Sequence, residues 1–304
     1  MSIQGLTDSQ PALTEAGWLA RLAMSYAHDG ERTVLQHQHD GPLRVLKSLY
    51  PESPHICHNV LIHPPSGLVG SDRVEVQVSV QAGAHALVTT PGATRFLGRS
   101  EQWASQRLRA EVAAGARLEW LPMETVVYPG AHAHNALSIH LAPSAEVMYW
   151  DVYALGLKHS GQPFQSGRLW VHTEIEGQWL EQFQLEAHDD RLMHSRQGLQ
   201  GHTCMGQMVL ARGLSAEEVA QLRPCFEALA EATQQHLAKV QADGPGLGQA
   251  PGVWGLTEAQ PGVLTLRALA DEVRDLRALF ECAWQFWRRE HWGLRDQPPR
   301  MWAL

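Results

Sequence analysis

Apolar and polar residues alternate through most of the first two-thirds of this chain of 304 residues. The clearest run puts five residues on one face of an extended segment: Trp18, Ala20, Leu22, Met24 and Tyr26. Valines at every second position of residues 74–80 repeat the pattern. A period of two is typical of half-buried β-strands. The pair Asp29-Gly30, followed by a new alternating run from Thr33, predicts a tight hairpin after the first strand.

Three ten-residue stretches align with one another without gaps. They are QAGAHALVTT (81–90), AAGARLEWLP (113–122) and APSAEVMYWD (142–151), and they begin 32 and 29 residues apart. Each follows an alternating strand and supplies a turn of small residues and then a second strand. Repetition at this period predicts stacked β layers, as in a β-helix-like solenoid. A β-meander that reuses Ala-Gly turns is the alternative that the sequence leaves open.

The pattern changes to helical spacing after about residue 212. Ser215 and Glu218 form a capping box that opens a helix, which continues to about residue 240. Pro224 is expected to kink or split this helix, because proline removes a backbone hydrogen bond. A short strand is expected at 263–266. A stronger helix is predicted at 268–290, where apolar residues recur at three- and four-residue steps.

The expected fold is mainly β, with a stacked β-layer body and a few helices near the C-terminus. Residues 1–14 are expected to form a flexible N-terminus. Residues 15–304 are expected to form one domain, with the β body over about 15–212 and the helices within about 213–304. The glycine- and proline-rich stretch 242–252 is expected to be a turn-rich connection.

The composition is that of a globular protein, with a net charge of −8 and an isoelectric point near 6.1. No basic excess is available to neutralise phosphates, which argues against a nucleic-acid partner. No apolar run approaches a membrane span and no secretory signal opens the chain, so a cytoplasmic location is expected. The four cysteines form no CxxC pair, so neither a zinc knuckle nor a disulfide framework is indicated.

Residues 55–72, HICHNVLIHPPSGLVGSD, concentrate histidine, cysteine, proline and glycine. The stretch lacks the lysine and following helix of a P-loop, and no βαβ unit surrounds it. Imidazole and thiolate suit transition metals, so Cys57, His58 and His63 are candidates for weak, transient metal contact. The alternative is that these side chains simply pack and hydrogen-bond within a β interior.

A second candidate metal site combines His132 and His134 with Glu174. Two histidines and a carboxylate are the ligand set of iron-dependent oxygenases, so a β-barrel oxygenase is the alternative function. Gly130 and Asn135 around the histidine pair favour an exposed turn instead. No nucleophile elbow and no HExxH helix is present. The motifs therefore do not predict an enzyme.

Seven ordered stretches resemble the urease accessory protein UreD family, called UreH in some organisms. They are GWLARL (17–22), GPLRVLKSLYPE (41–52), CHNVLIHPPSGLVGSD (57–72), GAHALVTTPGATRF (83–96), LEWLPMETVVYPGA (118–131), WDVYALG (150–156) and FQSG (164–167). The chain departs from the family pattern at Ser66 and Ser71, where the family commonly has glycine, and around Arg99.

The resemblance implies a β-rich scaffold that is not catalytic and holds no tightly bound cofactor. Proteins of this family bind apo-urease and, through a UreF-type protein, a UreG-type GTPase, and they handle nickel transiently during its delivery to urease. These partners and this cargo are expectations that the resemblance brings to the chain, beside the oxygenase alternative above.

A route for nickel through the protein interior is also implied by the resemblance. The residues expected along it are Asp72, Thr90, Glu124, Asp151 and Glu181. The first four lie within or beside the matched stretches, and Glu181 follows the last of them. The expected docking surface for a UreF-type partner is aromatic and lies near the C-terminus, at Trp284, Phe286, Trp287 and Trp292.

Overall fold

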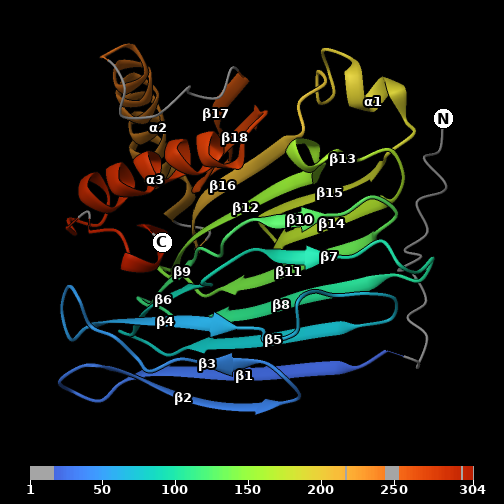
Figure 1. The fold of residues 1–304 in the computed structure, drawn as a ribbon. Coiled ribbons are helices and arrows are strands. Elements are labelled where there is room, and N and C mark those ends of the chain that lie inside the picture. Colours follow the sequence, from blue (N-terminus) through green and yellow to red (C-terminus); the bar gives the residue numbers. More distant parts are fainter. Residues whose placement is uncertain (1–16, 216–217, 244–252, 296, 304) are drawn as a thin grey trace, which may run out of the picture.

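The computed structural model describes residues 17–215, 218–243, 253–295 and 297–303, and two β-sheets packed face to face form its body (Figure 1). The first sheet has seven strands, in the order β15 (Trp179–Glu186), β14 (Arg168–Ile175), β11 (His132–Leu141), β8 (Ala104–Val112), β5 (Arg73–Val80), β1 (Leu19–His28) and β2 (Thr33–Asp40). The second sheet has eleven strands, with the main order β17 (Val253–Gln260), β18 (Val263–Ala270), β16 (Cys204–Arg212), β12 (Glu146–Leu157), β9 (Arg117–Trp120), β6 (His85–Thr89), β4 (Ile56–Ile62) and β3 (Arg44–Val45), and with β7 (Thr94–Phe96), β10 (Thr125–Val127) and β13 (Gln162–Pro163) beside it.

The chain alternates between the two sheets and winds as a β-solenoid. β5, β8 and β11 pair in parallel in the first sheet, and each leads through a tight turn to β6, β9 or β12, which pair in parallel in the second sheet. His85, Arg117 and Glu146 stand side by side in the second sheet, at the same spacings of 32 and 29 residues as the sequence repeat. The prediction of stacked β layers is confirmed.

The turns of the repeat explain why small residues recur in it. Gly83 and Gly115 occupy the left-handed region, with φ of 75° and 69°. Glycine adopts this conformation without strain because it has no Cβ. The third unit places Ser144 there with φ of 65°. The Ser144 hydroxyl accepts a hydrogen bond from the backbone N–H of Gly115 at 3.1 Å, so the serine ties two adjacent turns together.

The predicted N-terminal hairpin is present as β1 and β2. Antiparallel pairing ends at His28 and Thr33, on either side of the Asp29-Gly30 turn. The Asp29 carboxylate accepts hydrogen bonds from the backbone N–H groups of residues 31 and 32, which fixes the turn. The alternating apolar residues from Ala20 to Tyr26 are buried, as expected.

Two hydrophobic cores lie on the two faces of the second sheet. The first fills the space between the sheets, and the second lies between the second sheet and the helices α2 (Glu218–Asp243) and α3 (Val273–Glu290), which cover its outer side (Figure 1). Along β12, Tyr149 and Tyr153 face the first core, whereas Met148, Trp150 and Val152 belong to the second. Short helices among the described residues include α1 (Asp190–His194) and the 3₁₀ turns Lys158–Ser160 and Arg300–Ala303.

The helical part differs from the prediction at two points. The last long helix begins at Val273 instead of residue 268, because β18 continues to Ala270 and pairs with β16. α2 continues through Pro224 without a break, so the prediction that this proline splits the helix is wrong. The predicted capping contact is present, since the Glu218 carboxylate accepts from the backbone N–H of Ser215 at 2.9 Å.

The expected flexible N-terminus lies outside the described residues, and so does most of the expected connection, residues 244–252. Among the helices that the structure describes, none is both long and apolar enough to cross a membrane.

Candidate functional site

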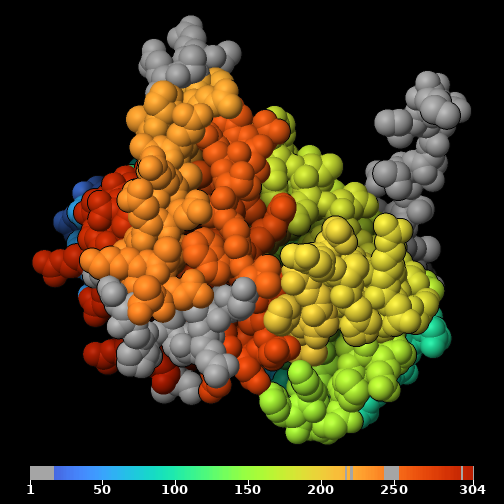
Figure 2. Space-filling model, turned by 90° about the horizontal axis from the view of Figure 1, so that it is seen from above, coloured from blue at the N-terminus to red at the C-terminus, as the bar shows by residue number. Residues whose placement is uncertain are grey.

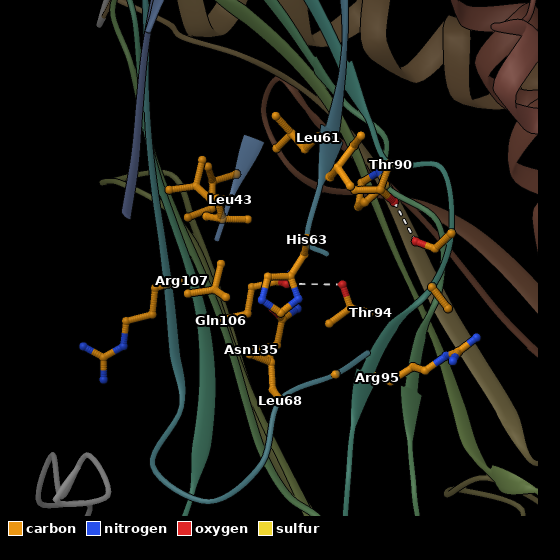
Figure 3. Close-up of a pocket in the computed structure, with 18 of the residues that line it drawn as sticks. Leu43, Leu61, His63, Leu68, Thr90, Thr94, Arg95, Gln106, Arg107 and Asn135 are labelled. Atoms are coloured by element: carbon orange, nitrogen blue, oxygen red, sulfur yellow. Dashed lines mark hydrogen bonds between the residues drawn. The ribbon is translucent and has the colours of Figure 1, made fainter. Parts of the chain in front are cut away.

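A cavity of about 170 Å³ lies between the two sheets at the end where the loop of residues 63–68 meets β7 (Figure 3). Leucine side chains form part of its wall, and Figure 3 shows His63 in its centre, while the guanidinium groups of Arg95 and Arg107 point away from it. The polar lining comes from neighbouring coils of the solenoid and includes Thr90, Thr94, Gln106, Asn135 and Asp151. The sequence repeat thus places polar side chains of successive coils beside one another.

Asp151 is the acidic group of this cavity, and it is buried. One carboxylate oxygen, Oδ1, lies 3.4 Å from the amide Nδ2 of Asn135, whereas Oδ2 has no hydrogen-bond partner among the described residues. Burial raises the pKa of Asp151 to about 7, against the lowering effect of the Asn135 amide and with a smaller increase from the Glu181 carboxylate. A carboxylate in this position is costly unless a cation or water compensates it.

A row of polar groups continues from Asp151 toward the other side of the molecule. The Asn135 amide also donates to the Tyr153 hydroxyl at 2.6 Å. Gln207 stands beside Asp151 in the adjacent strand β16, and its Oε1 has no partner among the described residues. Tyr153 and Gln207 line a second cavity, a groove of about 450 Å³.

The groove contains Glu181, which is the next carboxylate after Asp151. It opens between the segment that follows α1 and the β17–β18 hairpin, and Figure 2 shows these two parts side by side in yellow and orange-red. Glu181 pairs with Arg267 of β18 at 2.5 Å across the groove. The polar groups therefore extend between the sheets from Thr90, through Asp151, to Glu181.

This row supplies carboxylate, hydroxyl and amide oxygens without a closed ligand set. In the part of the chain that the structure describes, no group of three or more His, Cys, Asp or Glu is placed to hold a metal ion. Oxygen ligands of this kind suit a divalent cation that keeps part of its water shell.

The other two residues expected along the route lie outside the row. The Asp72 carboxylate accepts from the backbone N–H of Val69 at 2.9 Å and so caps the loop beside the cavity. Glu124 is half-buried between β9 and β10 and is not part of the lining of either cavity; its backbone carbonyl accepts from Thr94. Of the five residues, Thr90 and Asp151 line the first cavity and Glu181 lines the groove.

The three candidates for transient metal contact are separated from one another. Cys57 faces the first core, and burial raises its pKa. His58 lies on the opposite face of β4 and bonds to Glu52 at 2.8 Å. His63 lines the cavity and stacks on Trp18 with ring centroids 5.1 Å apart, and burial lowers its pKa. Of the three, only His63 shares a cavity with Asp151.

A buried cluster of charges that the sequence did not indicate lies on the other side of the second sheet. Arg288 of α3 is fully buried and contacts Glu52 at 2.9 Å and Glu119 at 3.5 Å. The His85 ring lies 2.7 Å from the Glu119 carboxylate, and the Trp284 N–H donates to that carboxylate at 2.5 Å. Burial raises the pKa of Glu119, but Arg288 and His85 outweigh it and hold that pKa at about 2. The cluster fastens α3 to the sheet.

The prediction of a metal site built on His132, His134 and Glu174 is wrong. His132 and His134 begin the strand β11 instead of forming an exposed turn, and His134 is buried against Trp170, with ring centroids 4.3 Å apart. Glu174 lies four residues beyond Trp170 on β14, or about 13 Å along a strand. Burial lowers the pKa of His134 to about 4. The geometry gives no support to an oxygenase built on these residues.

The expected aromatic docking surface is buried instead of exposed. Trp284 and Trp287 have no exposed surface, and Phe286 and Trp292 are each 7% exposed. The Trp287 N–H donates to Thr233 of α2 at 2.9 Å. These side chains belong to the second core, because α3 packs against both the sheet and α2.

Comparisons with known proteins show which family the chain belongs to. Residues 19–303 match the family described as UreD urease accessory protein. The chain is 46% identical to a urease accessory protein UreD of Paracidovorax citrulli and 45% identical to one of Albidiferax ferrireducens, over 94% of this chain and 99% of each relative. A urease accessory protein UreD of Variovorax paradoxus is 42% identical over the same shares. The chain belongs to the UreD urease accessory protein family.

Proposed function

We propose that this protein is a urease maturation scaffold that assists the delivery of nickel to the urease active site. Its relatives are named urease accessory proteins, which supports a role beside urease without catalysis of its own. In this role the protein binds apo-urease in the cytoplasm. It also binds a UreF-type protein, which brings a UreG-type GTPase.

The polar row between the sheets is the observation that carries the nickel part of the proposal. A sandwich interior of this kind is normally filled by apolar side chains, as most of this one is. Asp151 and Gln207 break that rule and leave Oδ2 and Oε1 without partners among the described residues. Buried oxygens without partners cost free energy unless a water molecule hydrogen-bonds to them or a cation binds them.

The order of the polar groups suits transfer from one group to the next. Thr90 and Asp151 share the first cavity, and the Asp151 carboxylate interacts electrostatically with Glu181 in the groove. Nickel accepts oxygen and imidazole ligands, so His63 can add one imidazole at the first cavity. A site with few protein ligands releases its ion readily, which a carrier requires.

The proposal is tested by deleting the gene for this chain in a host that expresses urease and its other maturation proteins. Urease is then purified, and its nickel content and activity are measured. We expect nickel-poor, inactive urease that regains both when the gene is restored, while total cellular nickel stays constant. Fully loaded, active urease in the deletion strain would contradict a maturation role.

A further inference from the structure

An ion pair spans the groove where the polar row meets the surface. Glu181 belongs to β15 at the edge of the first sheet, and Arg267 belongs to β18 of the second sheet. Their contact therefore joins the two sheets across the groove. An ion that moved between the groove and Asp151 would contact the Glu181 carboxylate on the way. That carboxylate is paired with the Arg267 guanidinium.

The exposure of this pair sets it apart from the buried pair of α3. The Arg267 side chain is 53% exposed and that of Glu181 22% exposed, whereas Arg288 and Glu52 are 0% and 4% exposed. An ion pair with an exposed member is screened by solvent and contributes little free energy. A buried one is held by the cost of leaving either charge alone. The pair at the groove can open without loss of the fold.

We propose that Arg267 controls the passage of a divalent cation at the groove, by holding Glu181 until the ion displaces its guanidinium. This inference rests on the function proposed above and assigns a specificity-determining residue to it. A doubly charged ion gains more from the Glu181 carboxylate than a guanidinium with one charge does. A monovalent cation has no such advantage, so the pair favours divalent over monovalent ions.

The surrounding charges fit this role. Arg196 also lines the groove, so two arginines and one carboxylate are among its lining residues. The Asp151 carboxylate acts on Glu181 from the interior side. When Arg267 swings into solvent, the Glu181 carboxylate becomes open to the ion, and after the ion leaves, Arg267 pairs with Glu181 again.

The test measures binding of Ni²⁺ to the purified full-length protein by equilibrium dialysis. Replacing Arg267 by Gln frees Glu181 and removes one positive charge. We expect the Kd for Ni²⁺ to fall about fivefold, which corresponds to about 1 kcal/mol. The double variant with Glu181→Gln and Arg267→Gln should lose this gain. Arg267→Lys keeps the charge and should stay within about twofold of the wild type.

A matched control is Arg223→Gln on α2, which breaks an exposed Arg–Glu pair of the same kind, with Glu227 at 3.1 Å, away from the groove. It should leave the Kd unchanged. If Arg267→Gln leaves the Kd unchanged while Asp151→Asn weakens binding, the role of Arg267 is overturned and the interior route stands. If neither substitution changes Ni²⁺ binding, the nickel part of the proposed function fails as well.

Discussion

The amide of Asn135 holds the carboxylate of Asp151 between the two sheets, with Nδ2 of Asn135 3.4 Å from Oδ1 of Asp151. The same amide nitrogen donates to the Tyr153 hydroxyl at 2.6 Å, so one side chain orients two buried oxygen atoms. Because Oδ2 of Asp151 is left without a partner among the described residues, the carboxylate has a free acceptor in a buried position. A buried carboxylate oxygen without a partner lowers the stability of the folded state.

Replacing Asp151 by Asn should therefore stabilise the protein at neutral and higher pH. The pKa of Asp151 is raised from 3.8 to about 7, so the folded state binds the proton more tightly than the unfolded state does. Its contribution to stability is complete below about pH 4 and is lost as the pH rises to about 7. At pH 8 we expect Asp151→Asn to gain on the order of 3 kcal/mol in free energy of unfolding.

Urea unfolding of the wild type and the variant at pH 5 and pH 8 measures this difference. The gain should be smaller at pH 5, where the wild-type carboxyl is mostly protonated. An equal difference at the two pH values would mean that the Asp151 carboxyl does not titrate in this range.

Arg288→Ala should be among the most destabilising single substitutions on α3. It removes the charge that compensates Glu52 and Glu119, both of which are buried with it. Leaving buried carboxylates unpaired costs about 3–5 kcal/mol. Chemical unfolding checks this, with Arg223→Ala as the control, because its exposed pair with Glu227 is worth about 0.5 kcal/mol or less. Similar losses for the two variants would contradict the buried cluster.

Two glycines with similar backbone angles should respond differently to alanine. Gly115 has φ of 69°, and a Cβ added there would meet open space, so Gly115→Ala costs only the left-handed strain of about 1 kcal/mol. Gly156 has φ of 74°, and a Cβ there would lie 2.5 Å from the backbone nitrogen of Phe164. Gly156→Ala should cost about 3 kcal/mol, because strain and a backbone clash add.

Thermal unfolding of the two glycine variants compares them directly. A smaller loss of stability for Gly156→Ala than for Gly115→Ala would show that β13 and β12 do not approach each other as closely as the structure places them.

The stacked layers could be predicted because their signal is local and repeats. The turns at Gly83, Gly115 and Ser144 recur at the spacing at which the strands pair. The start of the last helix could not be placed, because residues 263–270 are apolar at nearly every position and fit a strand or a helix equally well. Pairing with β16 makes residues 263–270 a strand in the folded protein.

Contacts between distant parts of the chain limited the prediction of the site. Asp151 could be named from its matched stretch, but its neighbour Gln207 comes from a strand 56 residues later, and no local pattern joins them. One signal in the sequence could have identified Asn135. It lies at the same alternating positions of the strand as the buried Ala133 and Leu137, so it is a polar residue at a core position. The tryptophans of α3 were misplaced because a helix packed on two sides buries more than one apolar face.

The most direct test of the nickel route is the nickel content of urease matured with Asp151→Ala in place of the wild-type chain. The control is Asp271→Ala, since the Asp271 side chain is 54% exposed and lies outside both cavities. Both variants should still co-purify with urease. We predict nickel-poor urease with Asp151→Ala and fully loaded urease with Asp271→Ala. Full loading with Asp151→Ala would contradict the claim that nickel passes between the two sheets.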